Sequence, residues 1–130
     1  MKPGRCSTVT RKATPRRRQA GNNKDLTGVV RTPFDEPTAN VTVRDLTIDG
    51  NRDENSSGKV DGFYCGTAPG SVVQDTDITV LNVEVRDCSG YGFDPHEQTL
   101  RLTIEDCVSH GNGLDGFTLD FLIDSTIRNN

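Results

Sequence analysis

The sequence contains no tryptophan, and aromatic residues make up only 5% of the chain. Apolar residues of all kinds reach 32%, and no stretch approaches the roughly 20 consecutive apolar residues that a membrane-spanning helix requires. Such a composition is too poor in apolar side chains for a helix bundle, and it suits thin, repetitive β structure. The basic N-terminus is not followed by an apolar segment, which argues against a Sec-type signal peptide.

The four cysteines are also unlike a metal or disulfide framework. Cys6, Cys65, Cys88 and Cys107 show no CxxC spacing. Zinc sites and disulfide scaffolds use closely and regularly spaced cysteines, so neither is expected. We predict that these cysteines act as small buried or turn residues.

Charge is segregated along the chain. Residues 1–24 hold eight Lys or Arg and no acidic residue, whereas residues 25–130 hold 7 basic and 19 acidic residues, a net charge of −12. No aromatic residue and no helical periodicity accompanies the basic segment, which argues against a nucleic-acid partner. We predict that residues 1–23 are disordered and separate from a body formed by residues 24–130.

A repeat of alternating apolar and polar residues runs through this body. It occupies residues 41–51, returns at 78–88 and 102–112, and begins a fourth copy at residue 125, with steps of 37, 24 and 23 residues. The long first step contains an insertion around residues 52–76. A period of 23–24 residues with β-branched strands and Gly, Asn or Asp turns predicts a parallel β-helix of about four coils. Leucine-rich repeats share the period, but leucine is scarce here.

The repeat places residues in columns, because successive coils of such a fold lie about 4.7–4.9 Å apart. One column is expected to be buried, a second to lie at a turn where asparagines stack with one cysteine between them, and a third to be an aromatic stack. Their members are Leu46, Val83 and Cys107; Asn51, Cys88 and Asn112; and Phe63, Phe93 and Phe117.

The densest polar chemistry lies in residues 90–97, which place Tyr91, Asp94 and His96 among two glycines and a proline. Counting from the aromatic column, His96 and Asp120 should be neighbours on successive coils. Asp94 and His96 should share a face of one strand, and Lys59 should bring a cation from the coil below. Polar groups from three coils are therefore predicted to converge on one patch of the solenoid wall.

Three kinds of chemistry fit this patch. Its carboxylates could hold Ca²⁺, which takes six to eight oxygen ligands, or they could flank a glycosidic bond. A histidine and a tyrosine on opposite sides of a sugar also suit removal and return of a proton α to a carboxylate. That reaction needs the carboxylate charge to be offset, by Lys59, a protonated carboxyl or Ca²⁺.

Four segments carry a resemblance to a known family: NVTVRDLTIDGN at residues 40–51, SGKVDGF at 57–63, SGYGFDPHEQ at 89–98 and NGLDGFTLD at 112–120. They resemble the catalytic module of the secreted, calcium-dependent bacterial mannuronan C5-epimerases. The resemblance covers about residues 24–130. It implies a right-handed parallel β-helix that converts β-D-mannuronate to α-L-guluronate within alginate polymer, with Ca²⁺ as the cofactor and alginate as the partner.

The same resemblance implies roles for single residues. Tyr91 and His96 would transfer the C5 proton, Asp94 would help to bind and neutralise the substrate carboxylate, and Asp120 would complete the acidic wall beside His96. Substrate-binding roles fall on Lys59, Asp61, Tyr64 and Glu97. No residue is assigned to a metal.

The resemblance covers only part of the family's module. Its N-terminal coils and capping helix, later basic coils, calcium-repeat modules and secretion signal have no counterpart here. We therefore expect a fragment open at both ends, monomeric, prone to aggregate and weakly active or inactive. An extracellular location follows from the family alone. Two alternatives stay open: an alginate lyase on the same scaffold, and an inactive or polysaccharide-binding remnant.

Overall fold

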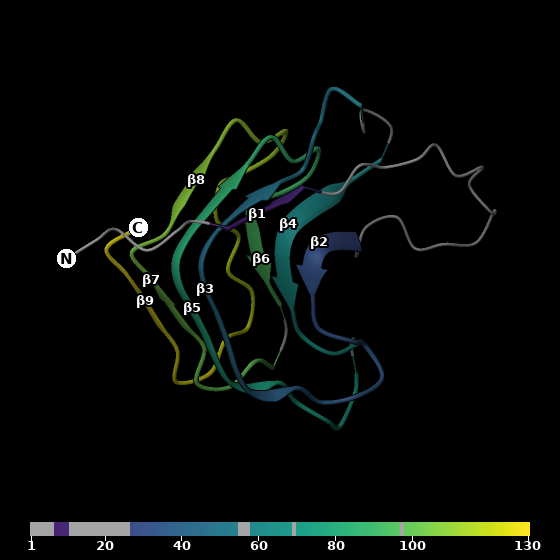
Figure 1. Ribbon diagram of the computed structural model, residues 1–130. Coiled ribbons are helices and arrows are strands. Elements are labelled where there is room, and N and C mark those ends of the chain that lie inside the picture. Colours follow the sequence, from purple (N-terminus) through teal and green to yellow (C-terminus); the bar gives the residue numbers. More distant parts are fainter. Residues whose placement is uncertain (1–6, 11–26, 55–57, 69, 97) are drawn as a thin grey trace.

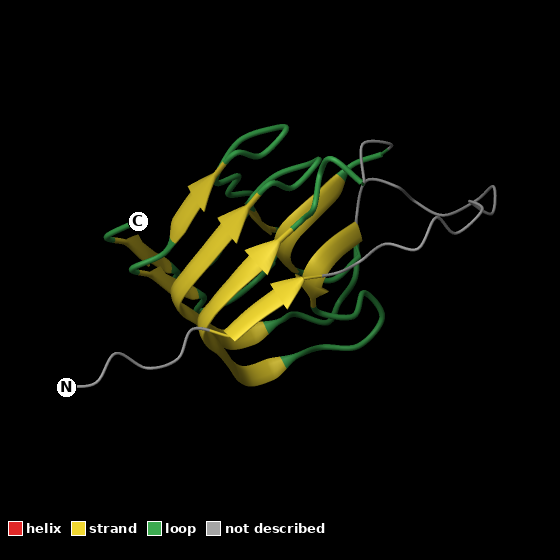
Figure 2. Cartoon of the chain, turned by 45° about the horizontal axis from the view of Figure 1, so that its top comes forward, coloured by secondary structure: helices red, strands yellow, loops and turns green. Residues whose placement is uncertain are grey.

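The computed structural model describes residues 7–10, 27–54, 58–68, 70–96 and 98–130. Within these ranges the chain forms nine strands, and every strand pairing is parallel. One sheet has the order β1-β3-β5-β7-β9, with β8 also paired to β5, and a second has the order β2-β4-β6 (Figures 1 and 2). The chain visits the two sheets in turn and returns one layer further along each time. This arrangement confirms the predicted parallel β-helix.

The strands of the larger sheet are β1 (Ser7–Thr10), β3 (Ala39–Asp49), β5 (Thr76–Arg86), β7 (Thr103–Glu105), β8 (Val108–His110) and β9 (Thr126–Arg128). Those of the smaller sheet are β2 (Thr27–Arg31), β4 (Val60–Cys65) and β6 (Phe93–Pro95). β5 is long because it runs without a break around a corner of the coil. On the next coil the same stretch is split into two shorter strands, β7 and β8. The middle of β5 pairs with β7 and its end pairs with β8.

The strand register confirms the predicted steps. Leu46 lies beside Val83 on the next coil, Thr79 lies beside Thr103, and Thr103 lies beside Thr126. From β3 onward, the contacts of the larger sheet therefore join residues 37, 24 and 23 positions apart. On the smaller sheet the long step is only 30 residues. The extra residues therefore form two loops rather than one insertion, one before and one after β4.

Asn and Asp residues form the corners of the coils. One column consists of Asp45, Asn82, Asp106 and Asn129, with φ angles of 56°, 51°, 53° and 55°. Side chains with a β-carbon rarely adopt this left-handed conformation, and Asn and Asp tolerate it best because their short polar groups can bond to the local backbone. A turn residue repeated at one position thus bends each coil at the same place.

The core lies between the two sheets. Val80, Val83, Val85 and Ile104 are at most 1% exposed, and the described cysteines Cys65, Cys88 and Cys107 are buried as free thiols, as predicted. Cys6 lies outside the described residues. The predicted aromatic stack is present: the ring centres of Phe63 and Phe93 are 6.2 Å apart, and those of Phe93 and Phe117 are 4.7 Å apart, with their planes nearly parallel at 7°.

The basic N-terminal segment differs in part from its prediction. Ser7–Thr10 forms β1, whose residues pair with Leu46 to Asp49 of β3. For these four residues the structure does not match the expected disorder. Three of the four are β-branched, which favours a strand, and they pair with the open edge of β3. The rest of residues 1–23 lies outside the described residues, and the domain boundary at residue 24 stays a prediction.

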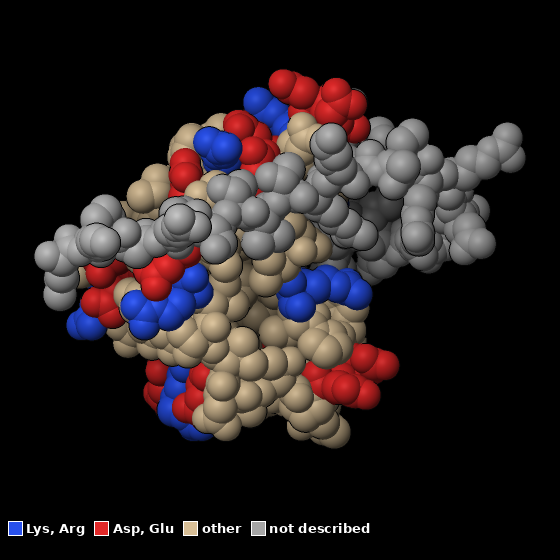
Figure 3. All heavy atoms as spheres, in the orientation of Figure 1, with Lys and Arg blue, Asp and Glu red and all other residues tan. Residues whose placement is uncertain are grey.

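Charged side chains on the outside of the larger sheet pair from coil to coil. The contacts are Arg86 Nη2 to Asp49 Oδ2 at 3.1 Å, Arg101 Nη2 to Asp77 Oδ2 at 2.6 Å, Arg128 Nη2 to Glu105 Oε1 at 2.8 Å and His110 Nε2 to Glu84 Oε1 at 2.8 Å. We call these contacts the outer ladder. Figure 3 shows acidic and basic side chains lying next to one another, with uncharged surface between the groups. Across the described ranges there is no helix able to span a membrane.

Candidate active site

The predicted polar residues meet beside the smaller sheet. Lys59 Nζ lies 3.6 Å from Asp94 Oδ2, and Asp94 Oδ1 lies 3.8 Å from His96 Nε2. His96 Nε2 is also 3.7 Å from Asp120 Oδ2 on the following coil. The neighbours inferred from the repeat are thus close in space. We use the name polar cluster for Lys59, Asp61, Tyr91, Asp94, His96 and Asp120.

Tyr91 joins the polar cluster through its ring and its backbone. Lys59 Nζ lies 4.3 Å from the centre of the Tyr91 ring, a distance at which a cation is attracted to an aromatic face. The Tyr91 backbone N–H donates to Asp61 Oδ1 at 2.7 Å. Lys59 Nζ is also 3.6 Å from Asp61 Oδ2. The lysine therefore lies against both carboxyl groups and the tyrosine.

A glycine permits this close packing. Gly90 comes just before Tyr91, and a β-carbon there would collide with Asp61 Oδ1 and lie 2.7 Å from Cγ of Lys59. Only a residue without a side chain lets the two coils approach so closely. The local sequence Gly90-Tyr91 thus helps to fix where the Asp61 carboxyl sits.

Exposure divides the polar cluster into two layers. The side chains of Lys59 and His96 are 23% and 24% exposed, and that of Asp120 is 47% exposed. Asp61 and Asp94 are completely buried. Groups that can meet a polymer from solvent therefore lie above two carboxyl groups that cannot reach it without movement.

His96 is held from several directions. Its backbone N–H donates to the Cys65 carbonyl at 2.7 Å, and its carbonyl accepts from the Thr99 hydroxyl at 2.9 Å. Its imidazole stacks on the Tyr64 ring, with ring centres 5.7 Å apart and planes 25° apart. A β-carbon on Gly66, whose φ is 132°, would lie 3.0 Å from Cβ of His96. Both the ring and the backbone of this histidine are therefore restrained.

Two predicted substrate-binding residues are buried too deeply to touch a polymer directly. Tyr64 is 1% exposed and packs against His96 and, edge to face, against the Phe34 ring 5.4 Å away. Asp61 is buried beside Lys59. In the present conformation both residues support exposed groups instead of facing solvent. Glu97 lies outside the described residues, so its predicted role stays a prediction.

Several supporting residues were absent from the prediction. Asp75 is fully buried; its Oδ2 accepts from the Thr32 hydroxyl at 2.7 Å and from the Gly66 N–H at 2.8 Å. It thereby fixes the backbone beneath His96. Asp75 and Thr32 lie in non-repeating parts of the chain, so the repeat gave no signal for them. Thr99, also fully buried, follows His96 by three residues. The sequence alone gave no reason to assign it more than a place in a turn.

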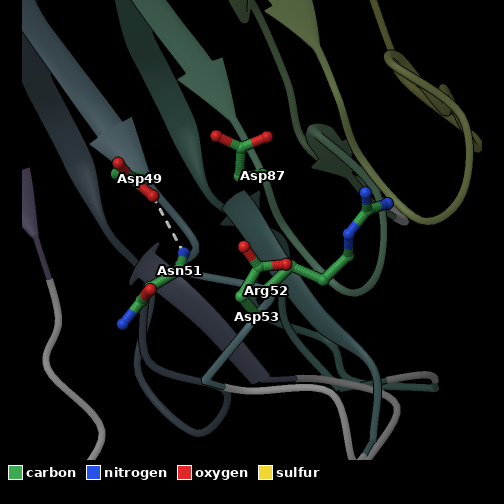
Figure 4. Close-up of a pocket in the computed structure, with 5 residues that line it drawn as sticks. All are labelled: Asp49, Asn51, Arg52, Asp53 and Asp87. Carbon is green, nitrogen blue, oxygen red and sulfur yellow. Dashed lines mark hydrogen bonds between the residues drawn. The ribbon is translucent and has the colours of Figure 1, made fainter.

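An acidic hollow lies elsewhere, where β3 and β5 end. It is lined by Asp49, Asn51, Arg52, Asp53 and Asp87 (Figure 4). Asp49 is engaged there, because its Oδ1 accepts from the Asn51 N–H at 2.9 Å and its Oδ2 pairs with Arg86. Across the described ranges no three His, Cys, Asp or Glu residues are grouped so that they could hold a metal ion. The structure therefore identifies no site for the predicted calcium ion among the described residues.

Comparison with known proteins identifies relatives of the chain. No protein-family model matches it. Mannuronan C5-epimerase AlgE4 of Azotobacter vinelandii is 57% identical over 110 residues, which are 85% of this chain and 20% of that protein. Mannuronan C5-epimerase AlgE1 of the same organism is 54% identical over the same share of this chain and 8% of its own. Alginate lyase 7, also from Azotobacter vinelandii, is 51% identical and matched over 13% of its length.

Solved structures agree with the sequence matches. The A-module of AlgE4 superposes with a TM-score of 0.76 at 60% identity, over 80% of this chain and 28% of that chain. The A-module of AlgE6 gives the same TM-score at 56% identity and is covered over 27% of its length. The chain thus spans a fifth or less of the curated relatives named here and under a third of each solved module. The relationship to the mannuronan C5-epimerases that the motifs predicted is confirmed.

Proposed function

We propose that this chain, a homologue of the mannuronan C5-epimerases, supplies the proton-transfer site of an enzyme that epimerises mannuronate in alginate. The observation that carries the proposal is the continuous contact from Lys59 through Asp94 and His96 to Asp120, with Tyr91 against the lysine. It combines two groups able to move protons with a cation able to meet a sugar carboxylate. The substrate class, alginate, is inferred from the relatives, which include mannuronan C5-epimerases and an alginate lyase.

Epimerisation requires one proton to leave and another to arrive. One member of the pair Tyr91 and His96 removes the C5 proton, and the electron pair of the C–H bond moves into the adjacent carboxylate. The other member donates a proton to the opposite face of C5, which forms the new C–H bond. Each positioned acid or base contributes about 10²–10⁴-fold to such a rate. Lys59 stabilises the charge that develops on the carboxylate.

Asp94 has a supporting role in this scheme. Because it is buried, it acts through Lys59 and His96, each of which lies within 4.0 Å of one of its oxygens. Tyr64 and Asp61 support the same two exposed groups from below. The residues predicted to touch substrate thus divide into an exposed set and a set that positions it.

The lyase among the relatives makes elimination the second candidate. The same base would remove the C5 proton, but the electron pair would expel the 4-O-linked sugar and leave a C4–C5 double bond. The two reactions share proton removal and differ only in the fate of the electron pair. Retention of the leaving sugar in place would favour epimerisation.

Incubation of polymannuronate with the protein in D₂O tests both candidates at once. The epimerase proposal expects new guluronate signals in the proton NMR spectrum, with deuterium at C5. A rise in ultraviolet absorbance from unsaturated chain ends, without guluronate, would support the lyase. Binding to the polymer with neither product would contradict both and leave a polysaccharide-binding remnant.

Calcium dependence is a separate prediction, drawn from the resemblance alone. The described residues show no metal-binding group, so no step above runs through calcium. A body of net charge −12 and a polyanionic substrate would nevertheless repel each other at low ionic strength. If calcium bridges them, alginate binding should weaken in EDTA and recover with added Ca²⁺. Unchanged binding in EDTA would remove the ion from the proposal.

A further inference from the structure

Two buried carboxyl groups of the polar cluster lack hydrogen-bond donors. Oδ2 of Asp61 and both side-chain oxygens of Asp94 have no hydrogen-bond partner among the described residues, although both side chains are 0% exposed. Lys59 Nζ is 3.6 Å from each carboxyl, which is close enough for attraction but too far for a good hydrogen bond. A buried carboxylate without donors is costly, and such a group tends to take up a proton instead.

The two carboxyl groups also meet at one lysine. Asp61 is fixed by the Tyr91 N–H, which donates to its Oδ1, and Oδ2 of Asp61 and Oδ2 of Asp94 each lie 3.6 Å from the same Lys59 Nζ. Two ionised carboxylates offer only acceptors, so nothing bonds between them. One proton converts the same contact into a strong, charge-assisted hydrogen bond. A shared proton would thus supply one of the missing donors.

Burial raises the pKa of Asp61 from 3.8 to about 7, opposed by the hydrogen bond from Tyr91 and the charge of Lys59, while the neighbouring Asp94 raises it further. The other titratable groups around the pair come from every adjoining coil. They are Lys59 and Tyr91 beside Asp61, His96 beside Asp94, Asp120 beyond His96, and the buried thiols of Cys65 and Cys88.

We propose that Asp61 and Asp94 share one proton and so form, with Lys59, an electrically neutral trio beneath the substrate. Asp61 is then a positioning residue: it holds the proton that keeps Asp94 from adding a second negative charge. The proposal rests on the proposed function, because a neutral trio matters most when the substrate is a polyanion. Loss of the proton would leave the trio with a charge of −1 and repel the sugar carboxylate.

NMR of the protein with ¹³C-labelled aspartate side chains tests the shared proton directly. We expect the carboxyl resonance of Asp61 to titrate near pH 7. Asp61→Asn should abolish that titration, and Asp94→Asn should do the same if the first variant folds poorly. Asp77→Asn, on the exposed outer ladder, should leave it unchanged. Titration of every aspartate near the ordinary value of about 4 would overturn the proposal.

The dependence of KM on pH separates positioning from a purely structural role. In Asp61→Asn the amide oxygen still accepts from the Tyr91 N–H, and the amide nitrogen donates to Asp94 without titrating. For the unaltered protein, KM for polymannuronate should rise roughly fivefold or more between about pH 6 and about pH 8 as the trio becomes negative. In Asp61→Asn that rise should disappear. A rise that persists in the variant would contradict the positioning role.

The two experiments fail independently. The NMR titration needs no substrate, so an Asp61 resonance that titrates near pH 7 would support the shared proton even if polymannuronate gave no product. In that case only the proposed function would fall. Guluronate formation together with aspartates that all titrate near the ordinary value would support the proposed function and overturn the shared proton.

Discussion

The outer ladder and the polar cluster both bring side chains of neighbouring coils together. On the ladder the carboxylates are paired and at least partly exposed to solvent, whereas in the polar cluster two carboxyl groups are buried and short of hydrogen-bond donors. On the ladder every named carboxylate has an arginine or histidine partner: Arg101 Nη2, for example, lies 2.6 Å from Asp77. That pairing lowers the pKa of Asp77 through hydrogen bonding and charge. In the polar cluster Asp61 and Asp94 are buried, and three of their oxygens have no donor among the described residues.

The difference shows where the fold departs from its most stable arrangement. A repeat can satisfy charges simply by stacking opposite signs, as the ladder does. The polar cluster instead keeps two carboxyl groups in a place that costs free energy, which proteins retain chiefly at functional sites. The two histidines of the chain make the comparison direct, since His96 lies in the polar cluster and His110 on the ladder.

The two histidines give the largest expected contrast. His96→Ala should lower epimerisation of polymannuronate by about 10²–10⁴-fold, because it removes a positioned proton-transfer group. His110→Ala is the matched control and should leave the rate within about twofold, since its imidazole pairs with Glu84 on the exposed sheet face. Product formation followed by NMR measures both. Equal losses in the two variants would break the distinction between the surfaces.

A glycine column should show the next largest effect, on stability. A β-carbon on Gly92 would collide with the Ser109 hydroxyl and lie 2.5 Å from the Gly116 carbonyl oxygen. Gly92→Ala should therefore lower the free energy of unfolding by about 2–3 kcal/mol, measured by denaturant titration.

Gly116 provides the comparison for that variant. It occupies the same column one coil later, but a β-carbon there would meet its nearest atom at 3.3 Å. Gly116→Ala should therefore cost clearly less than Gly92→Ala. The opposite order would show that the coils do not pack around the polar cluster as tightly as the structure indicates.

The pH dependence of stability should be smaller and should come from the polar cluster. The folded-state pKa of Asp61, about 7, lies above its ordinary value of 3.8, so the folded protein binds more protons than the unfolded chain between these values. The free energy of unfolding should therefore fall as pH rises from about 4 to about 7, and stay level above that.

Asp61→Asn should remove part of that slope and stabilise the protein at pH 8, relative to pH 5, by about 1–2 kcal/mol. Urea denaturation at the two pH values measures the difference. Asp75→Asn is not an equivalent control, since Asp75 is buried with three donors. Asp77→Asn, which is exposed, should leave the slope around neutrality unchanged. If Asp61→Asn kept the original dependence of the unfolding free energy on pH, a group other than Asp61 would be responsible for that dependence.

The smallest effect should come from the outer ladder. Arg101→Ala removes an exposed ion pair with Asp77, and pairs of this kind are weak because water and salt screen them. Its denaturation curve should be indistinguishable from that of the unaltered protein at about 0.5 M salt. A clear loss of stability at high salt would show that the ladder is more than a solvated surface.

Much of the fold was predictable because a repeat transmits local information. Once the step was known, Leu46, Val83 and Cys107 had to share a column, and the phenylalanines had to stack. The same repeat carries one further signal: the recurrence of Asp45, Asn82, Asp106 and Asn129 at one position marks the left-handed corner of each coil. The edge strand β1 had no signal of this kind, because it stands outside the repeat.

The contacts within the site could be predicted from the repeat register, but the burial of the site residues and the groups that support them could not. The register brought His96 beside Asp120 and Lys59 towards Asp94. It gave no indication that Asp61, Tyr64 and Asp94 would be buried, or that Asp75 would fix the backbone below His96. Those features depend on the loops on either side of β4, which do not repeat and so follow no pattern in the sequence.

The sequence by itself determined the coil spacing, the stacking of like residues and the set of groups that meet at the site, because each follows from a period and an alternation of side chains. Tertiary structure alone decided which of those groups face solvent. Burial depends on every segment that packs around a residue, and here it left two carboxyl groups as a donor-poor pair beneath a partly exposed lysine and histidine.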